Sequence, residues 1–182
     1  MLPTASDEEA SIRATIAAAL RSDFAVSSGG VSVGDYDFVK KVLDDLGAET
    51  LFWRVAMKPG KPLAFGQIDS TPIFGLPGNP VSSFVSFEQF VRPSLKKMMG
   101  SADLKPKSIQ AKLTQPVRKK PGRLHFLSAS LGRINGAYSV TPNEEQGSGI
   151  LKSMVHAEGL MVFPLEASEL NAGDLVTVQL LY

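Results

Sequence analysis

The sequence has 182 residues, of which 43% are hydrophobic and 20% are charged, a balance typical of a folded protein. Its 19 basic and 18 acidic residues leave a net charge of +1, which lacks the basic excess expected of a nucleic-acid-binding protein. The absence of cysteine excludes disulfides, thiolate nucleophiles and cysteine-ligated metals. No apolar stretch approaches the roughly 20 residues of a membrane span, and residues 1–6 lack a secretory signal pattern. We therefore expect a cytoplasmic protein with no nucleic-acid or membrane partner.

The histidines and one short basic run give little direct guidance. His125 and His156 lie far apart without a ligand pattern beside them, which argues against a structural zinc site. Four cations lie close together in the sequence: Arg118, Lys119, Lys120 and Arg123. A solvated loop explains this run about as well as a binding surface does, and both interpretations stay open.

The first predicted elements alternate between helix and strand. Ser6 and Glu9 have the spacing of a capping box, and Ile12, Ile16 and Leu20 would share one face of the helix that follows. Further along, apolar runs predict strands, and a second amphipathic pattern predicts a helix ended by Gly47. The predicted strands are residues 24–27, 50–56, 63–68 and 72–76, and the second helix covers residues 38–46.

A Pro-Gly-Asn-Pro segment predicts the start of a long helix. Asn79 is placed as its N-cap and Pro80 at its first position. The helix is expected to end near Gly100, with one apolar side formed by Phe84, Phe87, Val91, Leu95 and Met98. Strands that alternate with helices indicate an α/β domain with a parallel or mixed sheet covered on both faces, a three-layer arrangement.

The pattern changes near residue 101. From there on, short apolar runs separated by glycine, proline and asparagine replace the helical periodicity, which predicts a small all-β domain, a sandwich or a barrel. The expected runs are residues 109–113, 124–131, 138–141, 160–164 and 175–180. We therefore expect two domains, residues 1–103 and 104–182.

Three loops of the first domain carry residues suited to binding an anion. Residues 28–37 combine glycines and serines with Asp35 and Asp37, either of which could bind a metal or simply cap the next helix. Residues 58–62 hold Lys58 and Lys61 around a rigid Pro-Gly turn, which is either a solvated turn or a clamp for an oxyanion. Residues 77–83 place Asn79 and Ser82 at a helix N-terminus, where free N–H groups favour an anion. Together the loops suggest phosphate chemistry with Mg²⁺.

These three loops, in this order, resemble the signature loops of the MoeA family, the molybdopterin molybdenumtransferases that include the gephyrin E domain. The matching segments are residues 28–37, 57–62 and 75–82. The resemblance extends over essentially the whole chain and identifies it with the C-terminal half of that family. It implies an incomplete molybdopterin-binding-like α/β domain followed by a small C-terminal β-barrel-like domain.

The resemblance also implies an activity and its residues. The expected function is molybdenum cofactor biosynthesis, in which an enzyme uses Mg²⁺ to insert molybdate into adenylylated molybdopterin and releases AMP. Asp37 would be the catalytic, metal-binding carboxylate, and Lys58, Lys61 and Ser82 would bind molybdate. Residues expected at the pterin site are Ser28, Gly29, Gly30, Ser32, Pro77, Gly78, Asn79, Pro80, Arg123 and Ser148.

Family members are longer than this chain, and the resemblance implies that their other half completes the site. We therefore expect this chain alone to bind the anion without completing the reaction, and to form a homodimer. The adenylyltransferase and the recipient molybdoenzymes are the expected protein partners. Two alternatives remain: an enzyme like the molybdopterin adenylyltransferase, and a non-catalytic binding or scaffolding module.

Overall fold

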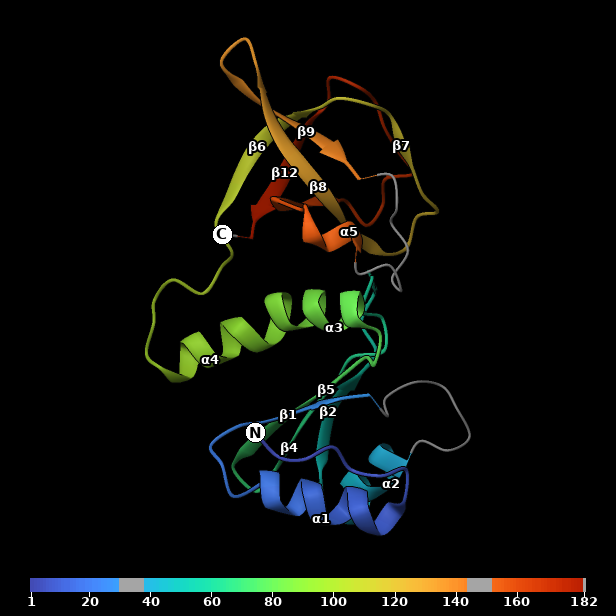
Figure 1. The fold of residues 1–182 in the computed structure, drawn as a ribbon, viewed down its shortest axis with the longest axis vertical. Helices are drawn as coiled ribbons and strands as arrows, with labels where there is room; N and C mark the ends of the chain where they lie inside the picture. Colours follow the sequence, from blue (N-terminus) through green and yellow to red (C-terminus); the bar gives the residue numbers. More distant parts are fainter. Residues whose placement is uncertain (30–37, 144–151, 182) are drawn as a thin grey trace. The chain divides into compact units, whose positions relative to one another are not determined.

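The computed structural model describes residues 1–29, 38–143 and 152–181, and these residues form two compact units. We call residues 1–55 and 60–79 the α/β unit, and residues 56–59 and 80–182 the barrel unit. The chain therefore passes between the units at Val55–Ala56, Pro59–Gly60 and Asn79–Pro80. Figure 1 shows the course of the chain through both units.

The α/β unit contains a mixed four-stranded sheet in the order β1-β5-β4-β2. Its strands are β1 (Ala25–Ser28), β2 (Glu49–Trp53), β4 (Ala64–Ile68) and β5 (Thr71–Leu76). The strands β1 and β5 are parallel, whereas β4 is antiparallel to both β5 and β2. The turn between β4 and β5 contains Asp69 at φ 52°.

Two helices, α1 (Glu9–Ala19) and α2 (Phe38–Asp45), lie along one face of this sheet (Figure 1). Their apolar residues meet alternate residues of the strands in a core of Ile16, Ala25, Val42, Leu43, Ile68 and Ile73. Ile12 and Leu20 pack against this core, as the helical spacing predicted. Gly47 ends the α2 turn at φ 79°, and its N–H donates to the carbonyl of Asp44.

The opposite side of the sheet carries a row of aromatic rings. Phe65 and Phe74 are register partners on β4 and β5, and their ring centroids lie 4.3 Å apart. Phe24 stacks on Phe74 at 5.6 Å, and Phe52 lies 5.5 Å from Phe65. Alternation of side chains along the strands thus gives the sheet an aliphatic face towards α1 and α2 and an aromatic face on the other side.

The barrel unit contains a sheet that closes on itself. Its strand order is β10-β12-β6-β9-β8, and β10 also pairs with β8, which completes the ring. The closing strands are β6 (Ser108–Leu113), β8 (Leu124–Ile134), β9 (Ala137–Pro142), β10 (Gly159–Phe163) and β12 (Leu175–Leu180). Closure leaves these strands without a free edge, and their inward residues form one core that includes Leu113, Val140, Met161, Phe163 and Val178.

Shorter elements are attached to this barrel. Strand β3 (Met57–Lys58) pairs in parallel with the beginning of β8. The strands β7 (Val117–Arg118) and β11 (Glu169–Leu170) form a separate antiparallel pair, and α5 covers only Lys152–Val155. Between Lys105 and Leu181 the described residues thus contain no long helix, which agrees with the predicted change of pattern near residue 101.

The long helix that the sequence predicted after Pro80 is interrupted by a π-helical turn. It consists of α3 (Pro80–Ser86), the π turn η1 (Phe87–Val91) and α4 (Arg92–Met98). Pro93 lacks the N–H that an α-helix would donate to Gln89, and Arg92 instead donates to the carbonyl of Phe87, five residues earlier. The wider turn shifts the buried side of the helix. The predicted apolar side is therefore wrong at both ends, where Phe84 and Met98 are exposed.

Two further sequence predictions are corrected. Helix α1 begins after Glu8, which makes no side-chain cap, and the backbone N–H of Ser6 donates to the hydroxyl of Ser11; the capping box is therefore wrong. The predicted strand at residues 50–56 ends earlier, at Trp53, because Arg54 takes a positive φ of 97° that no regular strand accepts.

The fold class predicted from the sequence is otherwise confirmed: an α/β domain precedes a domain of mostly strands. The predicted domain boundary between residues 103 and 104 stays a prediction. The two compact units are defined by contacts within each unit, and the chain passes between them three times, so they do not correspond to two continuous segments of the sequence.

Candidate functional site

The loops singled out in the α/β unit leave the same edge of its sheet. Ser28 at the end of β1 is the register partner of Leu76 at the end of β5. Ala64, where β4 begins, pairs with Gly75 on one side and with Trp53, the end of β2, on the other. Because these pairs lie side by side along the ladder, the segments after β1, after β5, after β2 and before β4 all meet at this carboxyl edge. In open α/β sheets this is where ligands bind.

Two of these loops begin in close contact. The N–H of Gly29 donates to the carbonyl of Leu76 at 2.9 Å. A Cβ atom built on Gly78 would lie 3.5 Å from the Cα atom of Gly29, so the two backbones pass each other at van der Waals distance. Gly29 has φ +92°, a conformation that L side chains rarely adopt. The glycines therefore allow the first and third loops to leave the sheet together.

Residues 61–63 are held at the same edge by two backbone hydrogen bonds. The N–H of Val55 donates to the carbonyl of Lys61 at 3.0 Å, and the N–H of Arg54 donates to the carbonyl of Leu63 at 2.8 Å. Leu63 is fully buried and Lys61 is exposed, so the segment has one anchored end and one end that presents an ammonium group to solvent. Its backbone is fixed by the sheet, as the Pro-Gly turn suggested.

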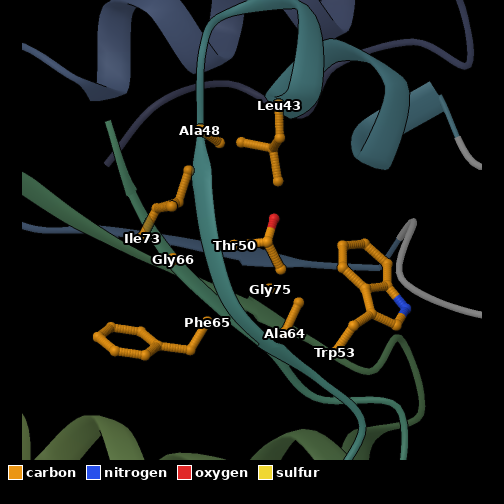
Figure 2. A pocket seen from close by; sticks show the side chains of 9 residues that line it. All are labelled: Leu43, Ala48, Thr50, Trp53, Ala64, Phe65, Gly66, Ile73 and Gly75. Carbon is orange, nitrogen blue, oxygen red and sulfur yellow. The ribbon is translucent and has the colours of Figure 1, made fainter. Parts of the chain in front are cut away.

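A small cavity lies between α2 and the sheet (Figure 2). Its volume is about 10 Å³, and its walls include Leu43, Thr50, Trp53 and Ile73. Lys40 lies 5.5 Å from the Trp53 ring, a cation–π contact at the outer side of this region. The space suits at most one water molecule, so it is not a binding site for a nucleotide or a pterin.

A much larger depression lies in the barrel unit and has a volume of about 500 Å³. We call it the basic groove. Its wall contains five cations, one histidine, two amides and four apolar residues: Lys58, Arg118, Lys119, Lys120, Arg123, His125, Gln115, Asn143, Pro116, Val117, Leu127 and Pro142. Among the described residues, none that lines the groove is acidic. A concave surface with this charge favours an anionic ligand.

Strand pairing explains how Lys58 reaches this groove. Met57 and Lys58 pair in parallel with Leu124 and His125, and the N–H of Leu124 donates to the carbonyl of Ala56 at 2.8 Å. The chain thus carries Lys58 from the second loop into the barrel unit, beside residues more than 60 positions later in the sequence.

Lys119 is the most firmly positioned cation of the groove. Its Nζ atom donates to the carbonyl of Leu165 at 3.0 Å and lies 4.9 Å from the ring centroid of Phe163. Its backbone N–H donates to the carbonyl of Ser168 at 2.9 Å. These contacts fix the ammonium group without neutralising its charge.

Carboxylates compensate little of this positive charge. Arg118 forms an ion pair with Glu169 at 2.7 Å, on the β7–β11 pair. Within residues 1–29, 38–143 and 152–181, no ion pair joins Lys58, Lys120 or Arg123 to a carboxylate. The effect reaches His125, whose pKa is lowered to about 4, first by burial and then by the charges of Lys58, Lys119 and Arg123.

The structure brings some predicted site residues together and separates others. Lys58 and Arg123 share the basic groove. Ser28, Gly29, Lys61, Pro77, Gly78 and Asn79 lie at the carboxyl edge in the α/β unit. Pro80 begins α3, and Ser82 is buried in that helix with 6% exposure and does not line the groove. Gly30, Ser32, Asp35, Asp37 and Ser148 lie outside the described residues.

The structure offers no test of the predicted metal site. Asp37, the carboxylate assigned to Mg²⁺, is one of the residues outside the description. In the part of the chain that is described, no group of three or more histidine, aspartate and glutamate side chains could hold a metal ion.

Sequence reasoning missed Lys119 and His125 as site residues. The only available signal was the run of cations at residues 118–123, which lies directly before an apolar strand. Its meaning depends on the pairing of β3 with β8, which brings Lys58 to the same place. A local pattern could not show that contact.

Comparisons with known proteins match two successive parts of the chain. Residues 2–97 match a family model described as the probable molybdopterin binding domain, and residues 110–181 match the MoeA C-terminal region (domain IV). No helix in the described ranges is long and apolar enough to cross a membrane.

Similar curated proteins are named molybdopterin molybdenumtransferase. The protein of that name from Haemophilus influenzae is 40% identical over 177 residues, which cover 95% of this chain and 43% of the relative. The one from Staphylococcus aureus strain COL is 32% identical over 172 residues, covering 94% of this chain and 41% of the relative. This chain therefore spans less than half the length of these relatives.

Solved structures show the same similarity. A molybdopterin biosynthesis MoeA protein from Pyrococcus horikoshii matches with a TM-score of 0.78 and 32% identity, covering 97% of this chain and 42% of that one. A molybdenum cofactor biosynthesis protein from Pyrococcus furiosus matches with a TM-score of 0.74 and 26% identity, covering 96% of this chain and 55% of that one.

Proposed function

This chain belongs to the family of probable molybdopterin binding domains, and on that basis we propose that it supplies part of an enzyme site that inserts molybdate into adenylylated molybdopterin. The observation that carries the proposal is the basic groove, where Lys58 and Arg123, both implicated by the MoeA resemblance, line one cavity. The relatives' name, molybdopterin molybdenumtransferase, supports the same reaction.

The chemistry of the groove suits these substrates. Molybdate is a tetrahedral dianion, and adenylylated molybdopterin carries phosphate groups, so both present oxygens that ammonium and guanidinium groups bind strongly. The groove has about 500 Å³, within the range of small-molecule sites, and none of its described lining residues is acidic. We assign Lys58 and Arg123 to the oxyanion, and the carboxyl edge with Ser28, Gly29 and residues 77–79 to the pterin.

We assign Mg²⁺ to Asp37. Lys61 and Ser82 are assigned to the molybdate site. The remaining residues assigned to the pterin site are Gly30, Ser32, Pro80 and Ser148. The metal would neutralise charge on the phosphates during adenylate cleavage and release of AMP. We also propose a cytoplasmic homodimer that receives its substrate from an adenylyltransferase and passes its product to molybdoenzymes. An adenylyltransferase-like function is less consistent with residues 110–181, which match the MoeA C-terminal region.

The experiment that tests this proposal measures molybdate binding by equilibrium dialysis. We expect the 182-residue chain to bind molybdate, and Arg123→Ala to weaken binding by about tenfold, equivalent to about 1.4 kcal/mol. Arg133→Ala is the matched control, because Arg133 lies in the β8–β9 hairpin, contacts Tyr138 and does not line the groove. Equal affinities of the Arg123 variant and the wild type would remove Arg123 from the site.

A second measurement separates the enzymatic proposal from its alternatives. Release of AMP from adenylylated molybdopterin that depends on molybdate supports insertion. Formation of the adenylylated pterin from ATP would support an adenylyltransferase instead. Binding of the pterin without either reaction, also in mixtures with a full-length relative, would support a non-catalytic module.

A further inference from the structure

His125 is a buried titratable group in the wall of the basic groove. Its side chain lines the groove although the residue is only 8% exposed. On β8 it is the register partner of Lys58 on one side and of Phe163 on the other. The imidazole and the Phe163 ring lie 6.5 Å apart, so one side of the histidine is apolar and another faces the cations.

Every charged group that faces His125 in the described structure is a cation. Lys58 comes from β3, Lys119 follows β7, and Arg123 immediately precedes β8. The neighbouring strand β10 contributes Phe163, which carries no charge. Within residues 1–29, 38–143 and 152–181, no acidic residue lines the groove to offset this field. A proton on the imidazole would add a further positive charge to a site that already holds several, so these cations oppose protonation of His125.

We propose that the basic groove takes up a tetrahedral dianion together with one proton, that His125 receives this proton, and that Lys119 is a prepositioned cation that contacts the anion. The inference rests on the proposed function only for the identity of the anion, because any oxyanion with two charges would meet the same groups.

Electrostatics links the two events. A dianion at the cations reduces the positive local potential and offers an oxygen that an imidazolium N–H can donate to. The proton comes from solvent, and no other bond forms or breaks. His125 is only 8% exposed, so solvent in the open groove screens this coupling in part and does not abolish it.

Lys119 is suited to contact the anion because its position is fixed beforehand. Its ammonium group donates to the carbonyl of Leu165 and lies over the Phe163 ring. Neither group carries a negative charge, so these contacts hold the ammonium group without neutralising it. Little side-chain entropy is then lost when an anion binds. By contrast, no hydrogen bond to a carbonyl or carboxylate within the described ranges holds Lys120, so its ammonium group is not prepositioned for an anion.

The test is an NMR titration of the imidazole Hε1 signals in the complete 182-residue chain, which contains only two histidines. His156 is exposed and does not line the groove, so it serves as an internal reference. Parallel titrations contain chloride, molybdate, inorganic phosphate or AMP at one ionic strength. The latter two distinguish a free oxyanion from the phosphate of a nucleotide.

Saturating dianion should raise the titration midpoint of His125 by about one pH unit or more and leave that of His156 unchanged. Chloride should change neither. An unchanged His125 midpoint under saturating molybdate and saturating phosphate would overturn the inference. A shift with phosphate but no binding of molybdate would keep the inference and contradict the proposed function. Binding of both molybdate and phosphate without a shift would overturn the inference and leave the proposed function standing.

Lys119→Met tests the second part, since methionine keeps an apolar stem against Phe163 and removes the charge. We expect about tenfold weaker phosphate binding and a higher His125 midpoint without anion. Lys112→Met, on the exposed side of β6, is the control and should change neither quantity. Unchanged phosphate affinity in a folded Lys119→Met protein would remove Lys119 from the site. If that variant does not fold, Lys119→Arg should retain binding, and its loss would contradict the role.

Discussion

Lys58 and His125 are register partners in the parallel pairing of β3 with β8, which places an ammonium group of the second loop next to a buried imidazole of the barrel. The two residues are 67 positions apart in sequence, and the pairing of only two residues of β3 joins them. The protonation of this histidine is therefore opposed by burial, by Lys58, which the pairing of two distant strands brings beside it, and by the nearby Lys119 and Arg123.

The first prediction follows from this pair. Because burial and neighbouring cations lower the pKa of His125 from 6.5 to about 4, the unfolded chain binds a proton more readily than the native chain between these values. The free energy of unfolding should therefore fall as the pH decreases from about 6.5 to about 4. We expect a contribution of about 2 kcal/mol from this residue, less than the full shift implies, because solvent in the open groove screens the neighbouring charges.

His125→Asn should remove this part of the pH dependence, whatever its effect at neutral pH. Urea unfolding of the wild type and the variant at pH 7, 5.5 and 4.5 measures the difference. His156→Asn, at an exposed position, should keep the slope of the wild type. If the free energies of unfolding of the wild type and His125→Asn changed equally with pH, the pKa of His125 would not be lowered in the folded chain.

The second prediction concerns the oxyanion clamp. Lys58 and Lys61 lie in different compact units, so joint binding of one anion stays a prediction. We expect Lys58→Ala or Lys61→Ala to weaken molybdate binding by about tenfold, with a smaller effect on the pterin, and affinity to fall as salt rises. Ser82→Ala should weaken it less, through loss of one hydrogen bond. Identical molybdate titrations of the wild type and the double alanine variant would exclude the clamp.

The third prediction assigns the catalytic carboxylate. In a full-length relative, the substitution corresponding to Asp37→Asn should abolish adenylate hydrolysis while pterin binding persists, because the amide carries no charge for Mg²⁺. The substitution corresponding to Asp35→Asn should have a mild effect. Activity is measured as AMP release, and the opposite ranking of the two variants would reverse the assignment.

The fourth prediction concerns close packing in the barrel. A Cβ atom on Gly159 would lie 2.5 Å from Cγ1 of Val178 and 2.9 Å from the carbonyl oxygen of Gln179, and the backbone atom cannot move away easily. We expect Gly159→Ala to lower the free energy of unfolding by about 1–3 kcal/mol.

Gly132→Ala is the matched comparison. On β8 its Cβ atom would meet only the hydroxyl of Ser139 at 3.0 Å, and this side chain can rotate. The cost should therefore be smaller than at Gly159. Equilibrium unfolding of both variants decides the point, and equal stabilities would show that β10 and β12 separate more readily than the structure implies.

Much of the fold was predictable because local periodicity determined it. The apolar spacing of Ile12, Ile16 and Leu20 places one face of α1 on the core, and Gly47 ends the second helix with a positive φ. The short runs after residue 101 correspond to β6, β8, β9, β10 and β12. The errors arose where a tertiary contact or a missing hydrogen-bond donor determines the local backbone. Pro93 is an example, because it lacks an N–H and lies just after the π turn.

The candidate site was predictable only in part. The loops beginning at Ser28 and Pro77 were expected together because both follow strands, and the parallel pair β1–β5 brings them to one edge. The basic groove could not be predicted. Its residues come from β3 and from residues 115–143, and only the closed barrel brings these segments into one wall.

The three passages of the chain between its compact units also determine how the protein can be divided. A cut in the segment between the two family matches, residues 98–109, looks natural by sequence but separates residues 56–59 and 80–97 from the rest of the barrel unit. The isolated C-terminal piece would then lack the strand that pairs with the start of β8, and Lys58 with it. That cation would have to be returned in trans, by a peptide containing Met57 and Lys58, so complementation by fragments and not simple truncation is the informative dissection of this molecule.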